Sequence, residues 1–329
     1  MKRTIKILIL LLILGFGKNS FGQQIGLFSQ YVSNDYMLNP AISGTKDYIP
    51  IHSSIRRQWV GITEAPVTQT LSVHAYTGQN FGIGGAFFNE ASGPTRRTGI
   101  NFSTAYHLVL KQESYRNQLT LSMGLQGSLT QNVLDKSQLT TFIPEDPTIL
   151  ESYNYQLVPD VGFGVYLHQS NKFYVGLSSL NLIQTKNDLY NLNNVVNNRM
   201  VRNYFVSAGG NFDFKTKNKK KVSLQPSVLF RMIEATPMQF DVNLKVNFDK
   251  TFWAGISYRH NDAVVALIGV RIYQMLVGYS YDFTISELKN YTYGSHELSL
   301  TLILNEGLSR RKKKGGFVPK NYRPSIPSF

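Results

Sequence analysis

The feature of this sequence that most constrains its fold is an alternation of apolar and polar side chains along segments of about ten residues. In Gln118–Thr130, leucine and methionine share one face of an extended chain, and serine, threonine, glycine and glutamine share the other. The same pattern recurs in Val161–His168, Phe240–Phe248 and Met275–Phe283. A period of two indicates β-strands that are apolar on one side. No soluble helix pattern of comparable length competes in residues 46–304.

The number and spacing of these strands favour a closed barrel. Bacterial barrels have short turns on the periplasmic side and long loops outside. The three longest connections, near 131–155, 181–199 and 286–294, all follow odd-numbered strands and therefore fall on one side. Fourteen strands are predicted, at about residues 49–60, 66–77, 80–90, 96–110, 117–130, 156–169, 172–180, 200–214, 220–233, 236–249, 251–260, 262–273, 275–285 and 295–305.

A periplasmic β-sandwich would show the same alternation, but its outer face would carry charge. Here the faces opposite the apolar ones hold mostly glycine, serine, threonine and asparagine, with isolated charges such as Asp160, Asp241, Lys245 and Arg259. Such faces suit a polar lumen. We therefore interpret residues 46–305 as an all-β, antiparallel transmembrane β-barrel in the outer membrane, in contact with its lipid.

Three segments lie outside the predicted barrel. Residues 1–22 have a basic start, a short apolar run and small residues before Gln23, which is the pattern of a cleaved signal peptide. Residues 23–45 end in a turn-rich stretch and are either periplasmic or lumenal. Residues 306–329 are a basic, proline-containing tail that strand parity assigns to the periplasm. The absence of cysteine excludes disulfides, thiolate–metal sites and a lipid-modified N-terminal cysteine.

No constellation of residues indicates catalysis. The six histidines lie on separate strands or strand ends, without the spacing of a metal site, and there is no G-x-S-x-G elbow. Gly82, Gly84 and Gly85, and likewise Gly162 and Gly164, resemble fragments of a phosphate loop, but no helix follows to hold a phosphate. We interpret them as small inward residues that relieve crowding at strand bends. The sequence therefore predicts no enzyme, no cofactor and no metal.

Basic clusters and one tryptophan are the candidates for partner binding. The run Lys215–Lys221 and the run Arg310–Lys314, here called the tail cluster, are both expected in the periplasm, where no nucleic acid is expected. They are either solvated or dock an acidic partner, peptidoglycan or anionic lipid. At the outer end of the first strand, the tryptophan either belongs to the interfacial aromatic girdle or contacts a partner. The two arginines before it are expected to point to opposite sides of the strand, so one must lie near the rim or snorkel. The candidates are Arg56, Arg57, Trp59, Lys219, Lys220, Lys221, Arg310, Arg311, Lys312, Lys313 and Lys314.

Several motifs along the chain resemble the PorP/SprF family of type IX secretion system outer-membrane proteins. The similarity runs over nearly all of the chain after residue 22. The motifs are Phe28-Ser29-Gln30-Tyr31, Asn39-Pro40-Ala41-Ile42-Ser43-Gly44, Arg57-Gln58-Trp59-Val60-Gly61, Ala65-Pro66-Val67-Thr68-Gln69-Thr70, Tyr281-Asp282-Phe283-Thr284-Ile285-Ser286 and Gly294-Ser295-His296-Glu297-Leu298-Ser299-Leu300.

The resemblance implies a role that periodicity does not. Members of this Bacteroidota family are barrels that assist the secretion or surface attachment of particular cargo, including large adhesins used in gliding motility. The resemblance implies capture of the cargo's C-terminal sorting domain by the outer loops. It also implies contact with the periplasmic ring or a peptidoglycan-binding partner, and it brings no catalytic residues. The rival interpretation is a diffusion porin or solute transporter, which polar inward faces and fourteen strands also allow.

Overall fold

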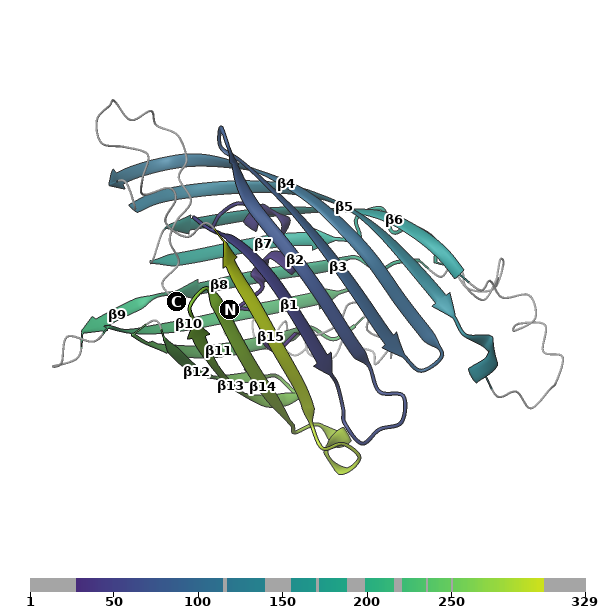
Figure 1. Ribbon diagram of the computed structural model, residues 1–329. Helices are drawn as coiled ribbons and strands as arrows, with labels where there is room; N and C mark the ends of the chain where they lie inside the picture. The colour runs from purple at the N-terminus through teal and green to yellow at the C-terminus, as the bar shows by residue number, and fades with distance from the viewer. Residues whose placement is uncertain are drawn as a thin grey trace, which may run out of the picture.

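The computed structural model describes residues 28–114, 117–139, 155–169, 172–187, 199–215, 221–234, 236–249 and 251–304. Their strands form one antiparallel sheet that curls until its first strand pairs with its last, as Figure 1 shows. Closure removes the free sheet edges that would otherwise expose unpaired backbone groups. None of the helices in the described part of the chain is long and apolar enough to span a membrane.

The strands follow one another around the barrel in chain order, and consecutive strands pair with each other except β8 and β9, which both pair with β10. Their bounds are β1 Ile49–Arg57, β2 Val67–Gly78, β3 Phe81–Ser92, β4 Thr95–Ser114, β5 Asn117–Leu134, β6 Tyr155–Gln169, β7 Phe173–Leu180, β8 Asn203–Gly210, β9 Phe212–Lys215, β10 Lys221–Ile233, β11 Gln239–Phe248, β12 Phe252–Arg259, β13 Ala263–Ile272, β14 Met275–Thr284 and β15 Ser295–Leu304.

Two of these strands, β8 and β9, are parts of one barrel strand. Both pair with β10, and Ser227↔Gly209 and Leu224↔Phe212 belong to the same register. Pro226 lies on β10 between these pairs and has no backbone N–H to donate, which is consistent with the break in regular pairing at this point. Counted in this way, the barrel has fourteen strands. The prediction of one strand over 200–214 is therefore confirmed as β8 and β9 together.

The two ends of the barrel differ in their connections. The end where β1 begins and β15 finishes, here called the terminal end, has connections no longer than the five residues 216–220. The opposite end, here called the loop end, carries the three longest ones, at 135–154, 181–202 and 285–294. The prediction that all long connections share one side is confirmed.

The outer and inner faces of the wall have opposite polarity. On β5, Met123, Leu125 and Leu129 point outward, and Leu125 is 60% exposed. On the same strand Ser122 and Gln126 point inward and are buried. Large aliphatic and aromatic side chains are exposed on strands all around the wall, which is the surface expected against lipid. The predicted outer-membrane β-barrel is confirmed, and the single closed sheet excludes the sandwich.

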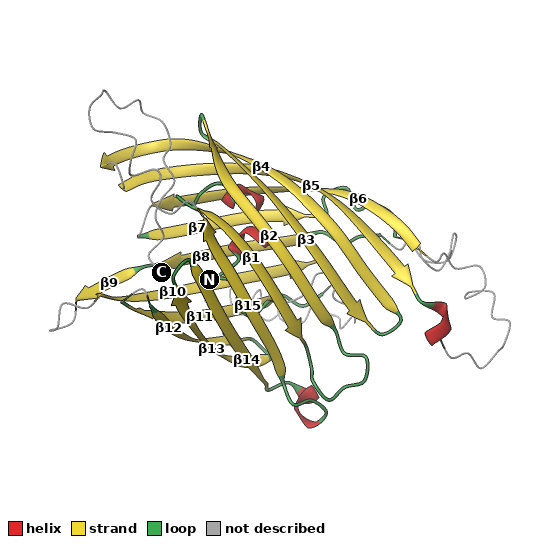
Figure 2. Cartoon of the chain, viewed as in Figure 1, coloured by secondary structure: helices red, strands yellow, loops and turns green. Residues whose placement is uncertain are grey.

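The interior of the barrel contains residues 28–45, here called the lumenal segment. The segment includes two short 3-10 helices, η1 (Asp35–Met37) and η2 (Pro40–Ile42), drawn in red inside the barrel in Figure 2. Ala41 and Ile42 are at most 1% exposed. The described part of the N-terminal segment therefore lies in the lumen and not outside the barrel.

Glycines on the wall make room for the lumenal segment. A Cβ added at Gly82 would overlap the backbone of Ser43 and Gly44, and one at Gly84 would overlap the ring of Tyr36. Likewise, a Cβ at Gly164 would overlap Asn39 and one at Gly124 the backbone of Pro40 and Ala41; at Gly162 it would meet Leu180 of the wall. The predicted inward direction is right for Gly82, Gly84, Gly162 and Gly164. It is wrong for Gly85, which follows the inward-facing Gly84 on β3 and therefore faces outward by the alternation of the strand. For Gly82, Gly84 and Gly164, however, the reason is space for the segment and not relief at strand bends.

Candidate functional site

A buried set of charged side chains fastens the lumenal segment to the wall near the loop end. We call it the charged network, and its central residue is an arginine of β1. The alternation of β1 turns Ser54 and Arg56 into the lumen. The network consists of Ser29, Arg56, Asp241, Arg259, Asp262, Asp282 and Glu297.

Arg56 joins three neighbouring strands. Its Nη2 donates to Oδ2 of Asp282 on β14 at 2.7 Å, and its Nη1 lies 3.3 Å from Oε2 of Glu297 on β15. Arg56 and Glu297 are direct partners in the register that closes the barrel. All three side chains are about 2% exposed. Charge-assisted hydrogen bonds of this kind are stronger than those between neutral groups. Because the three groups are buried, the loss of one would leave the charge of the others without compensation.

Arg259 of β12 extends the charged network to the next strands. Its Nε lies 3.1 Å from Oδ2 of Asp241, its partner in the β11–β12 register. Its Nη1 lies 3.2 Å from Asp282 and 3.3 Å from Asp262. Because Asp282 contacts Arg56 and Arg259, the two arginines and their acids form one connected unit across the wall. No group of three or more His, Asp or Glu side chains in the described ranges is arranged to hold a metal ion.

Ser29 connects the lumenal segment to this unit. Its hydroxyl donates to the Asp282 carboxylate, whose two oxygens both lie 2.7 Å away, and accepts from Nη1 of Arg56 at 2.7 Å. Its backbone N–H donates to Oε2 of Glu297 at 2.7 Å. The next residue, Gln30, donates from Nε2 to the backbone carbonyl of Glu297 at 3.1 Å. The segment therefore satisfies the wall charges, and the wall holds the segment.

From Ser29 onward the segment crosses the lumen and contacts the wall on other sides. The Tyr31 hydroxyl bonds Ser227 of β10 at 3.2 Å, and the Tyr36 hydroxyl bonds Ser103 of β4 at 2.8 Å. Burial raises the pKa of both tyrosines above the ordinary value, so both stay protonated. Asn39 donates to backbone carbonyls of β6 and β7 and caps η2 by accepting from the Ala41 N–H. These contacts, with those of the charged network, surround the segment.

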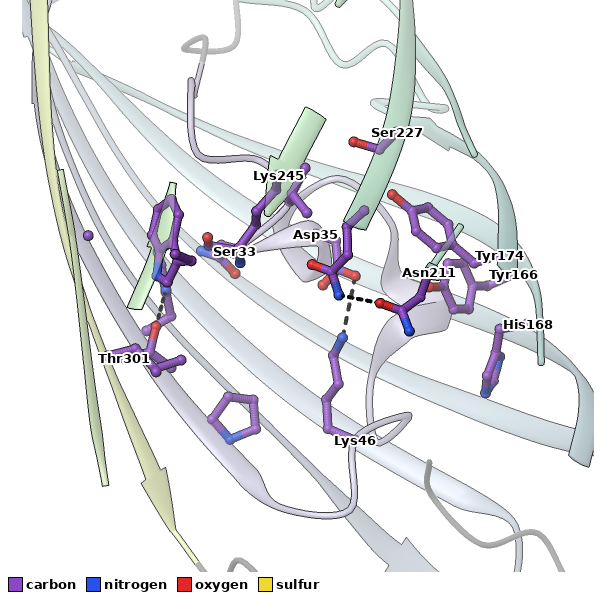
Figure 3. A pocket seen from close by; sticks show the side chains of 18 of the residues that line it. Ser33, Asp35, Lys46, Tyr166, His168, Tyr174, Asn211, Ser227, Lys245 and Thr301 are labelled. Carbon is purple, nitrogen blue, oxygen red and sulfur yellow. Dashed lines mark hydrogen bonds and ion pairs between the residues drawn. The ribbon is translucent and has the colours of Figure 1, made fainter. Parts of the chain in front are cut away.

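A cavity of about 190 Å³ lies between the lumenal segment and the terminal end. Lys46 and Asp35 form an ion pair on its wall, with Nζ and Oδ2 3.7 Å apart (Figure 3). Lys245 of β11 also lines it, with Nζ 4.5 Å from the ring centre of Trp253. The wall thus presents both cations and aromatic rings to this space.

The family model described as "Type IX secretion system membrane protein PorP/SprF" matches residues 20–302. The chain belongs to this family. The resemblance seen in the sequence is thus confirmed, and membership together with the barrel places the protein in the outer membrane as part of the type IX secretion system.

Comparison with curated proteins gives no match. Among solved structures, the chain is similar to the toluene transporter TbuX of Ralstonia pickettii (TM-score 0.47, 9% identity, 82% of this chain and 93% of that chain). It is also similar to the outer membrane protein Omp33 of Acinetobacter baumannii (TM-score 0.42, 9% identity, 80% and 100%). A third is the CymD monoaromatic hydrocarbon channel (TM-score 0.41, 14% identity, 86% and 95%).

Four of the six PorP/SprF motifs, which are far apart in the chain, meet in the barrel interior. The motif beginning at Phe28 supplies Ser29, and the one beginning at Asn39 supplies η2 and its contacts with the wall glycines. Arg56 directly precedes a third motif, and the two C-terminal motifs supply Asp282 and Glu297. These four motifs therefore coincide with the contacts that hold the lumenal segment.

The residues proposed for partner binding lie in different environments. Arg56 is buried and bonded to the chain's own N-terminal segment, whereas Arg57 points outward and is exposed at the end of β1. The two arginines thus point to opposite sides, as expected. Lys221 begins β10 and lies 2.8 Å from Asp213. Lys219, Lys220 and the tail cluster Arg310, Arg311, Lys312, Lys313 and Lys314 lie outside the described residues.

Trp59 lies in the β1–β2 connection, which is joined to the β14–β15 connection at the loop end. The Trp59 N–H donates to Oγ of Ser295 at 3.1 Å, and Val60 exchanges backbone hydrogen bonds with Tyr293 and Gly294. Trp59 itself is half-buried, with a positive φ of 48°. The ring of Tyr293 is 77% exposed. The two connections form a fixed, aromatic surface above the charged network.

Proposed function

We propose that this protein is an accessory barrel of the type IX secretion system that assists the secretion or surface attachment of a specific cargo protein. Membership in the family supports the secretion role. The observation that carries the accessory role is the lumenal segment, which is fastened to strands on several sides of the barrel. A lumen occupied by the chain itself favours work through protein contacts over passage of solutes. We propose no enzymatic activity.

The two ends of the barrel would serve different partners. Long connections in bacterial barrels lie outside the cell, so the loop end would face outward and the terminal end the periplasm. The outward partner would be the C-terminal sorting domain of a secreted cargo, a gliding adhesin among the candidates. Its binding surface would combine the loops 131–155 and 181–199 with Arg57, Trp59 and the exposed Tyr293, since aromatic residues and arginine are enriched in interfaces.

The terminal end would contact the periplasmic part of the secretion machine or a peptidoglycan-binding protein. The basic residues assigned to this side are Lys219, Lys220 and Lys221 and the tail cluster 310–314. Their charge would attract an acidic surface and raise the rate of encounter. Replacing the tail cluster by serines should weaken this contact and leave cargo recognition unchanged.

Deletion of the gene is expected to remove one protein, or a small group, from the cell surface while other type IX cargo is still exported. The measurement is quantitative mass spectrometry of surface-labelled proteins in the deletion strain, the parent and a complemented strain. Loss of all type IX cargo would contradict specificity and make the barrel a general component. An unchanged surface proteome would contradict the cargo role altogether.

A further inference from the structure

The cavity at the terminal end has a wall that is assembled from distant parts of the chain. It is bounded by η1 and the residues around it on one side and by strands of both halves of the barrel on the other. Its volume, about 190 Å³, is somewhat larger than the roughly 150 Å³ cavity that accepts benzene in an engineered protein. The space therefore suits a ligand of about one aromatic ring and a short side chain.

Cations outnumber anions among the charged residues that line this cavity. The charged residues are Asp35, Lys46, Lys172 and Lys245, which is three cations and one anion, or a net charge of +2. The single carboxylate, Asp35, already lies 3.7 Å from Lys46. Asp241 and Asp282 do not line this cavity, because they belong to the charged network near the loop end and contact the arginines there. The cavity thus presents an excess of positive charge.

Lys245 is the cation best placed to meet a ligand. It is half-buried, and within the described residues no carboxylate lies within ion-pair distance of its ammonium. Its partner is the indole of Trp253, 4.5 Å from Nζ to the ring centre. A Cβ added at Gly269 would overlap that indole, so the wall is shaped to hold it. A cation–π contact leaves the ammonium donors free for an anion.

The rest of the wall offers flat apolar surface beside this ammonium. Tyr166 and Tyr174 are stacked with ring centres 5.7 Å apart, and Figure 3 shows them on one side of the cavity. Phe173 and Pro226 add further apolar surface. Ligand sites commonly combine such walls with a few placed polar groups.

We propose that the terminal-end cavity binds a small carboxylate that carries an aromatic or apolar body. The carboxylate would accept hydrogen bonds from Nζ of Lys245, and the body would lie between Trp253 and the tyrosine pair. The ligand would enter from the terminal end, which the proposed orientation places in the periplasm. The chemistry of the cavity does not depend on which cargo the barrel serves, so failure of one proposal would leave the other intact.

The test uses tryptophan fluorescence of the purified full chain in zwitterionic nanodiscs. The chain has two tryptophans, so Trp59→Phe leaves Trp253 as the reporter. 3-Phenylpropionate should change its emission saturably, and the neutral 3-phenylpropionamide should bind roughly tenfold more weakly or worse, because hydrogen bonds to charged groups are the stronger ones. Binding of the carboxylate should weaken as salt is raised.

Variants test whether Lys245 itself, and not the positive charge of the barrel in general, binds the carboxylate. Lys245→Met should reduce affinity for the carboxylate to about that for the amide, whereas Lys245→Arg should retain most of it. Lys289→Met is the control, because Lys289 is exposed on η4 (Glu287–Asn290) at the other end of the barrel. Equal affinity for carboxylate and amide in the parent chain would overturn the proposal without any variant. Unchanged binding by a folded Lys245→Met protein would overturn it as well.

Discussion

Replacing Arg56 by alanine is expected to lower the free energy of unfolding by roughly 3–5 kcal/mol, the usual effect of breaking a buried ion pair on one side. The substitution leaves Asp282 and Glu297, each about 2% exposed, without their shared cation. It also removes the donor that reaches Ser29 at 2.7 Å. The measurement is equilibrium unfolding in denaturant of the barrel refolded into lipid vesicles, followed by tryptophan emission.

The adjacent arginine supplies the matched control for this experiment. Arg57 has the same chemistry but points outward and is exposed, so Arg57→Ala should change stability by less than about 0.5 kcal/mol. Arg56→Lys should fall between the two, because lysine keeps the charge and loses the forked geometry. Equal effects of Arg56→Ala and Arg57→Ala would contradict a buried network.

Gly124→Val is expected to displace the lumenal segment while leaving the wall of the barrel closed. A Cβ at this position would overlap the backbone of Pro40 and Ala41, and overpacking of this kind costs about 1–3 kcal/mol. In the cysteine-free chain, Ser43→Cys places a probe at a side chain that is 0% exposed. Gly124→Val should raise the rate at which a water-soluble maleimide labels this cysteine by roughly tenfold, since about 1.4 kcal/mol of local opening corresponds to that factor.

Gly127→Val on the same strand is the control for volume and for strand propensity. A Cβ there would have no heavy atom within 4 Å, and the residue faces outward. Its labelling rate should equal that of the parent. Equal acceleration by both valines would mean that the wall as a whole, and not the contact of Gly124 with η2, had been disturbed.

The strands were predictable because their signal is local. Period-two alternation and connection lengths predict the barrel, the number of its strands and the side on which each connection lies. Neither signal requires knowledge of distant contacts. The prediction of a single strand over 200–214 held, since β8 and β9 share one register with β10. The break between β8 and β9 was not predicted, although Pro226 on the neighbouring strand lacks the N–H that regular pairing would use.

Only part of the charged network could be predicted from the sequence. Asp241 and Arg259 were recognised as isolated inward charges, and the short turn between β11 and β12 would have paired them. The pairing of Arg56 with Glu297 needs the register of barrel closure, 241 residues apart. The role of Ser29 depends on the path of an irregular segment through the lumen. No period describes such a path, so it could not be predicted that Gly82, Gly84 and Gly164 make room for the segment.

The partner-binding residues show the same limit. Arg56 and Arg57 are identical neighbours in the sequence, and only their positions on β1 separate a lumenal anchor from an exposed side chain. The basic residues at 219, 220 and 310–314 remain predictions, because they lie outside the described residues.

The most direct test of the central claim is the conductance of the full-length barrel in a planar lipid bilayer. If residues 28–45 close the lumen and the protein works through contacts at its two ends, the purified barrel should show no steady open-channel current at moderate voltage. Under the same conditions Gly124→Val should show channel openings. A steady ohmic conductance of the unmodified protein, together with flux of a small dye from liposomes, would contradict the claim and support a porin.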